Sequence, residues 1–147
     1  GIVTGMVAGL ATITPGAGFV GPAGALVFGI VAGLVCYWCV GFIKTKIQID
    51  DSLDVFAVHG VGGALGIMLT SFFGAEALGG LGLGEGMTMT KQFGVQALGI
   101  SVVALWSLVI SWIIVKFIQK TTGLRVHEED EIEGLDITSH GERIHNN

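Results

Sequence analysis

The sequence predicts an all-α membrane protein that crosses the bilayer several times. About half of its 147 residues are hydrophobic, and only 13% are charged, which is about half the charged fraction of a soluble domain. Uncharged stretches long enough to span a bilayer recur between short polar segments. The 25 glycines are scattered through these apolar stretches, as is typical of closely packed membrane helices.

Four apolar segments make up the predicted membrane region, residues 1–120. They cover about residues 1–14, 21–43, 53–73 and 93–118. The first segment begins within an apolar run and stops at Thr14-Pro15-Gly16. We therefore expect it to be the end of a membrane helix, and this chain to be the C-terminal part of a longer protein.

Three glycine pairs have the G-x-x-x-G spacing that allows membrane helices to approach closely. They are Gly5 and Gly9, Gly29 and Gly33, and Gly62 and Gly66. The second pair predicts a close-packing face on its helix, and the third repeats the same spacing.

The segments between the spans are rich in glycine. Residues 16–21 match G-x-G-x-x-G, but a dinucleotide site needs a strand before this motif and a helix after it in a soluble unit. Both flanks here are membrane-like, so we expect a tight or re-entrant loop packed against protein. Residues 74–91 form a second connector, with a short surface helix expected at about residues 87–91.

The charges separate a neutral membrane body from an acidic tail, residues 121–147. Seven acidic and two basic side chains give the tail a charge of −5, which is the net charge of the whole chain. This distribution does not suggest nucleic-acid binding. Basic residues follow the second and fourth spans, and the positive-inside rule places these ends, and hence the tail, in the cytoplasm. The expected location is the plasma or inner cell membrane.

The third span carries one histidine, His59, among glycines. Asp51 or Ser52 can cap the first turn, and Asp54 adds a negative charge that the helix dipole favours there. If Ser52 is the cap, His59 lies roughly 10 Å along the helix axis, which is membrane depth.

An imidazole at membrane depth usually faces a bundle interior or a wet cavity. Helical spacing places Val55, Gly62, Gly63 and Gly66 near His59. That narrow, bare face predicts either a close partner helix or an open lumen beside the ring. The alternative is a structural histidine that donates one hydrogen bond to a neighbouring helix.

No metal, cofactor or catalytic site is predicted. Cys36 and Cys39 form C-x-x-C inside a membrane helix, where packing is the expected role. His127, His140 and His145 are too scattered for a metal site. No nucleophile and base are paired, so we expect no enzymatic activity.

Three groups of residues together resemble the ammonium transporter (ammonia channel) family, which is related to the Rhesus proteins. The first is the loop at residues 13–20, and the second is DDSLDVFAVHGVGG at residues 50–63. The third lies in the tail, at residues 123–126, 133–136 and 139–142. The resemblance covers the whole chain in order.

The resemblance implies an ammonium-transporter fold of eleven transmembrane helices, built as two inverted five-helix repeats and a last long helix. It also implies a homotrimer with one pore in each protomer. This chain would hold the end of helix eight, then helices nine, ten and eleven and the tail, which is about three and a half helices.

The implied function is transport of ammonium or ammonia through a hydrophobic pore that contains a pair of histidines. His59 matches the second histidine of the pair, and the first would lie outside this chain. Val55 matches a position on the pore wall. Asp51 and Asp54 are expected to have a structural role at the start of helix ten.

The tail resembles the segment that helps gate these channels and meets a PII-type regulator on the cytoplasmic side. The residues that carry this interpretation are Arg125, Gly134, Asp136, Thr138, His140, Gly141 and Glu142. Thr138 matches a position that is phosphorylated in some relatives. After Glu142 the family commonly continues with Ala-Tyr, whereas this chain has Arg143-Ile144-His145.

Two other functions fit the same residues. The first is an ammonium sensor that uses this fold and signals through its tail. The second is a Rhesus-type gas channel or a relative that carries another small amine.

Overall fold

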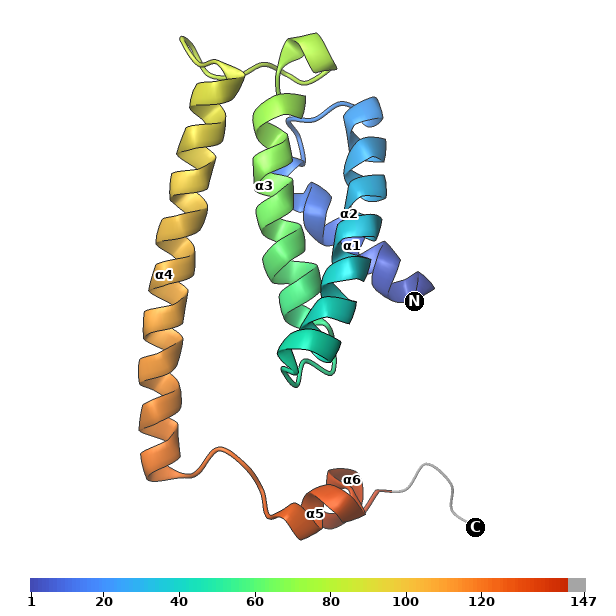
Figure 1. The fold of residues 1–147 in the computed structure, drawn as a ribbon, viewed down its shortest axis with the longest axis vertical. Coiled ribbons are helices and arrows are strands. Elements are labelled where there is room, and N and C mark those ends of the chain that lie inside the picture. Colours follow the sequence, from blue (N-terminus) through green and yellow to red (C-terminus); the bar gives the residue numbers. More distant parts are fainter. Residues whose placement is uncertain (143–147) are drawn as a thin grey trace. The chain divides into compact units, whose positions relative to one another are not determined.

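The computed structural model describes residues 1–142, and every regular element in that range is a helix. The chain divides into two units, Gly1–Val103 and Ala104 onward. The first unit contains helices α1 (Ile2–Ile13), α2 (Pro22–Phe42) and α3 (Gly62–Phe73), shown in Figure 1. It also contains the beginning of α4 (Met89–Thr121).

Helix α2 begins at Pro22, where the fixed backbone of proline suits the first helical position. It continues into a π-helical turn, Ile43–Ile47, so that one apolar helix covers Pro22–Ile47. Its buried residues recur every four positions, at Gly24, Phe28, Ala32 and Cys36. This single stripe packs against α1 and α3, and the other side chains of α2 are more exposed.

Close packing between α1 and α3 uses one of the three predicted glycine pairs. A Cβ atom on Gly66 would collide with the backbone carbonyl of Thr12, and one on Gly62 would lie 3.0 Å from Thr12 Oγ1. By contrast, no atom lies within 4 Å of a Cβ added to Gly29 or Gly33. A Cβ added to Gly9 would nevertheless lie 4.0 Å from Gly29 Cα, so Gly29 approaches α1 at ordinary van der Waals distance, less closely than Gly62 and Gly66 approach Thr12.

The third apolar segment begins as a π-helical turn, Phe56–Val61, and continues as α3 to Phe73. Together they give an 18-residue apolar helix, slightly shorter than the predicted residues 53–73. The hydrogen bonds of a π-helix join residues five apart rather than four. The extra residue changes how side chains before and after the turn line up along the helix.

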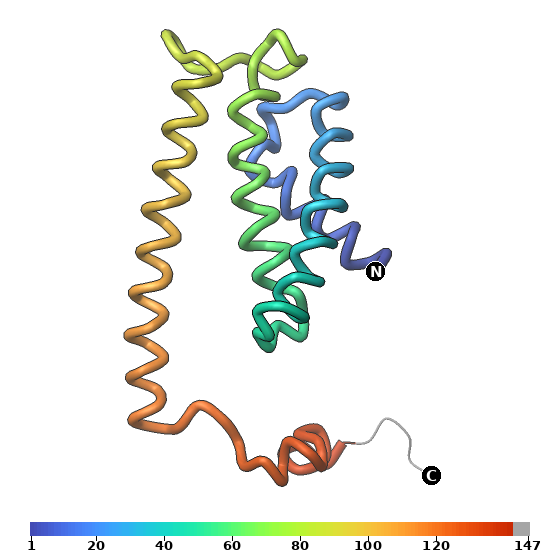
Figure 2. Tube along the Cα trace, in the orientation of Figure 1, coloured from blue at the N-terminus to red at the C-terminus, as the bar shows by residue number. Residues whose placement is uncertain are grey.

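The two glycine-rich connectors meet at the end of α3. The backbone N–H of Leu81 donates to the carbonyl oxygen of Phe19 at 3.0 Å, and a Cβ on Gly21 would collide with the carbonyl oxygen of Gly79. Figure 2 traces both segments at this end of the unit. The loop at residues 16–21 is thus packed against protein, as expected, and no strand precedes it.

Helix α4 is a long apolar helix of 33 residues, longer than the predicted span at 93–118. Its first residue is Met89, so residues 89–91 belong to α4 and not to a separate surface helix. With Pro22–Ile47 and Phe56–Phe73, it is one of three helices among the described residues that are long and apolar enough to cross a membrane.

The tail contains two short helices, α5 (Glu128–Glu133) and α6 (Leu135–His140). Gly134 separates them with a φ of 103°, and Gly141 ends α6 with a φ of 65°. Both values favour glycine. Arg125 reaches Glu131 through two N–H···O hydrogen bonds of 2.9 and 2.8 Å. The predicted departure from the family at Arg143-Ile144-His145 lies outside the described residues.

We predict that Gly66→Ala destabilises the protein, because the new methyl group meets a backbone carbonyl that cannot rotate away. Overpacking of this kind costs about 1–3 kcal/mol. Gly63→Ala is the matched control, since no atom lies within 4 Å of its added Cβ. Thermal unfolding of both variants in detergent measures the difference. Equal melting temperatures would contradict the proposed contact with Thr12.

Candidate functional site

His59 lies in the π-helical turn and lines an open cleft of about 500 Å³. The imidazole is exposed. The cleft lining is apolar except for the histidine and two carboxylates. Its residues are Ile43, Ile49, Asp50, Asp51, Val55, Phe56, His59 and Gly60. The structure thus brings His59 and Val55 together in one cleft.

The π-helical turn separates a packed side from an open side. Ala57 and Val58 are 1% and 3% exposed, whereas the next residue, His59, faces the cleft. The predicted bare face beside His59 is only partly correct. Gly62 and Gly66 belong to the side that packs against α1, while Gly63 has no neighbour within 4 Å of an added Cβ.

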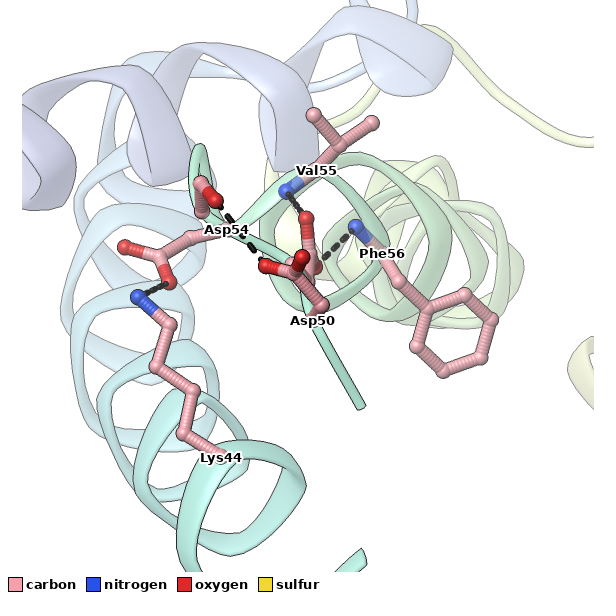
Figure 3. Close-up of polar contacts among 7 residues, drawn as sticks. Lys44, Asp50, Asp54, Val55 and Phe56 are labelled. Carbon is pink, nitrogen blue, oxygen red and sulfur yellow. Dashed lines mark hydrogen bonds and ion pairs between the residues drawn. The ribbon is translucent and has the colours of Figure 1, made fainter. Parts of the chain in front are cut away.

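Asp51 caps the start of this helix with both of its carboxylate oxygens. Oδ1 accepts the backbone N–H of Val55 at 2.8 Å, and Oδ2 accepts that of Phe56 at 2.9 Å. Figure 3 marks both hydrogen bonds with dashed lines that start at the labelled Val55 and Phe56. Ser52, the other capping candidate, instead donates its hydroxyl to Asp50 Oδ1 at 3.0 Å.

Asp54 immediately precedes the helix, with a left-handed backbone φ of 57°. Its Oδ1 atom lies 2.6 Å from Lys44 Nζ. Figure 3 marks this ion pair with a dashed line. Its backbone carbonyl accepts the N–H of Val58 at 2.9 Å. Asp54 is therefore tied to the end of α2 and to the first helical turn, and it is not among the residues that line the cleft of His59.

The predicted tail residues lie on and between α5 and α6. Thr138 Oγ1 donates to the carbonyl oxygen of Gly134 at 3.3 Å. The carbonyl oxygen of Asp136 accepts the backbone N–H of Glu142 at 2.8 Å. His140 is the last residue of α6, and Gly141 follows it.

The residues described here contain no group of three or more histidine, cysteine or acidic side chains that could hold a metal ion. Cys36 and Cys39 are both free thiols. Cys36 is buried, and its Sγ atom would lie 3.2 Å from a Cβ on Gly62. It therefore packs at the contact between α2 and α3.

Two features of the site have no clear signal in the sequence, namely the pairing of Lys44 with Asp54 and the two π-helical turns. In the sequence, Lys44 is recognisable only as a basic residue that follows a membrane span. Its partner lies ten positions further along, across a loop whose shape the sequence pattern does not give. The left-handed backbone at Asp54 also had no signal beyond the tolerance of aspartate for that conformation.

The imidazole in this cleft can form hydrogen bonds with a small polar solute that exchanges protons. A neutral imidazole donates one hydrogen bond through one ring nitrogen and accepts one through the other. The apolar side chains around it provide little competing solvation. Such a site can both donate a hydrogen bond to a small polar solute and accept one from it.

The model of the Ammonium Transporter Family matches residues 1–144. The chain belongs to the ammonium transporter family. It is 42% identical over 146 residues to an ammonium transporter of Aquifex aeolicus, covering 99% of this chain and 34% of that protein. It is 36% identical over 146 residues to the ammonium transporter of Bacillus subtilis, covering 99% of this chain and 36% of that protein.

Two solved structures of ammonium transporter type share the fold. One, described as a sensor Amt protein, has a TM-score of 0.81 and 34% identity, over 91% of this chain and 32% of that one. Mep2 of Candida albicans has a TM-score of 0.74 and 33% identity, over 96% and 33%. The predicted all-α membrane fold is confirmed, and the relatives are transporters rather than enzymes. The chain spans about a third of the length of these relatives.

We predict that Asp51→Ala loosens the start of the His59 helix, because the N–H groups of Val55 and Phe56 lose their acceptors. Losing a helix cap costs about 1–2 kcal/mol. Amide hydrogen exchange of residues 55–60, measured by mass spectrometry, should become faster.

Asp50→Ala is the control, since the Asp50 carboxylate accepts from Ser52 and from none of these backbone groups. Asp51→Asn, which keeps one acceptor oxygen, should give an intermediate rate. Exchange that is as slow in Asp51→Ala as in the unaltered protein would rule out the cap.

Proposed function

We propose that this chain is part of a transporter that carries ammonium or ammonia across a membrane, with His59 and Val55 in the wall of the pore. The observation that carries the proposal is the exposed imidazole in an apolar cleft on a helix long enough to span the bilayer. Membership of the ammonium transporter family indicates ammonium or ammonia as the substrate. Ionisable groups within membrane spans commonly mark a substrate path.

Imidazole suits this task because its two ring nitrogens let it donate one hydrogen bond and accept another. Ammonium must lose a proton to cross an apolar segment as ammonia, and such a ring offers both an acceptor and a donor for that transfer. The carboxylates of Asp50 and Asp51 at the edge of the cleft favour a cation there. His59 then takes or gives the proton while the apolar side chains exclude bulk water.

The cleft is open, and the opposite wall would come from the part of the relatives that this chain does not cover. That part would also supply the first histidine of the pair. We further propose that the complete protein is a homotrimer embedded in membrane lipid, as the family resemblance implies. Each protomer would have its own pore.

The tail is proposed to be a cytoplasmic regulatory segment. An even number of membrane crossings separates the lysines at the end of α2 from the basic residues around the end of α4. This topology puts both basic groups on one side of the membrane. The positive-inside rule makes that side the cytoplasm of the cell membrane. The acidic helix α5 and the apolar side chains of Leu124, Val126 and Ile132, all exposed, offer a surface for a PII-type regulator.

A sensor function is the second candidate, because one of the similar structures is described as a sensor Amt protein. In a sensor, ammonium would bind near His59 and the tail would report its presence to a signalling domain. Ammonium-dependent binding of a partner, with no ammonium flux into vesicles, would favour the sensor over the transporter.

We predict that His59→Ala lowers ammonium transport strongly. A side chain that passes a proton contributes about 100-fold or more to a rate, so the ammonium-driven current of the whole protein in proteoliposomes should fall by about that factor. His127→Ala, which removes a histidine from the tail, is the matched control and should leave the current unchanged. An unaltered current in His59→Ala would remove the imidazole from the transport path.

A further inference from the structure

One ion pair joins the two walls of the His59 cleft. One wall is formed by Ile43, in the π-helical turn that ends α2, and the other by Val55 and His59. Lys44 follows Ile43 directly, and Asp54 directly precedes Val55. Their side chains meet with Lys44 Nζ 2.6 Å from Asp54 Oδ1.

This ion pair is better protected from water than an ordinary surface pair. The Asp54 side chain is 17% exposed and that of Lys44 is 40% exposed. Partial burial lowers the effective dielectric constant and strengthens the attraction. Arg125 and Glu131, the other ion pair of the described chain, are 73% and 35% exposed and lie within the tail.

The backbone of Asp54 transmits the position of its side chain to the helix. Its N–H donates to the carbonyl oxygen of Asp51 at 3.2 Å, and its carbonyl accepts the N–H of Val58 at 2.9 Å. Val58 is buried and adjacent to His59. A displacement of Asp54 therefore moves both the capping segment and the residue that precedes the imidazole.

We propose that Lys44 and Asp54 are positioning residues, whose ion pair sets the width of the cleft and the orientation of His59. The proposal rests on the proposed role of His59 in transport. Without the pair, the two π-helical turns separate and the cleft accepts a larger substrate more readily. The measurable consequence is a loss of discrimination between ammonium and the bulkier methylammonium.

The test uses Lys44→Gln and Asp54→Asn in the whole protein. Asparagine tolerates the left-handed backbone of Asp54, so this substitution removes the charge with little backbone strain. Competition between ammonium and methylammonium for uptake into proteoliposomes should shift by about threefold or more in favour of methylammonium, a size typical of coupled neighbours. Lys46→Gln is the matched control, because Lys46 lies in the same turn and forms no ion pair within residues 1–142.

The double variant tests whether the two residues act together. If they do, Lys44→Gln with Asp54→Asn shifts the discrimination no further than either single variant. Amide exchange of residues 55–60 provides a readout that needs no transport, and it should be faster in both single variants than in Lys46→Gln.

Unchanged discrimination in either single variant would overturn the proposal, even if exchange becomes faster, because the pair would then be merely structural. Effects that multiply in the double variant would also overturn it. If the unaltered protein carries no ammonium, the proposed function fails, and exchange alone decides whether the ion pair holds the turn. In that case, amide exchange of residues 55–60 that is as slow in Lys44→Gln and Asp54→Asn as in Lys46→Gln would show that the ion pair does not position the helix.

Discussion

The two hydrogen bonds from Val55 and Phe56 to the Asp51 carboxylate are the interaction on which the site depends. Backbone N–H groups near hydrocarbon must find acceptors within the protein, and the first turn of a helix has no intrahelical acceptors to offer. Asp51 supplies two at once. The helix can therefore begin immediately after a residue with left-handed backbone geometry, only a few positions before His59.

Close packing of α3 against α1 determines which side of the His59 helix stays open. Gly62 and Gly66 bring the helix against the backbone and hydroxyl of Thr12, and Ala57 and Val58 extend this packed side toward the N-terminus. In the described residues, the buried Thr12 hydroxyl has no hydrogen-bond partner. A buried hydroxyl without a hydrogen-bond partner lowers the stability of the fold. The free energy gained by close packing of α3 against α1 offsets this loss.

Much of the fold could be predicted from apolar length, because hydrocarbon thickness sets the length of a span. The histidine also stood out, since a titratable side chain at membrane depth is rare. Spacing alone could not identify the glycines that cannot be replaced: Gly29 and Gly33 share the motif with Gly62 and Gly66, yet only a Cβ added to the latter pair would crowd a neighbour. Which pair is used depends on how each helix is rotated, and α2, apolar on all sides, gives no pattern for that. The π-helical turns and the Lys44–Asp54 pair depend on loop geometry that periodicity does not encode.

The π-helical turn explains how one short segment can pack against its neighbours and line a cleft at the same time. An uninterrupted α-helix would continue the side defined by Gly62 and Gly66 back through Val58 at four-residue spacing. The turn adds Ala57 to the packed side while His59 and Gly60 line the cleft. Local π-helical geometry is frequent at functional sites, and here it separates two adjacent residues into opposite environments. The imidazole can then face the cleft while its immediate neighbour, Val58, packs the helix in place.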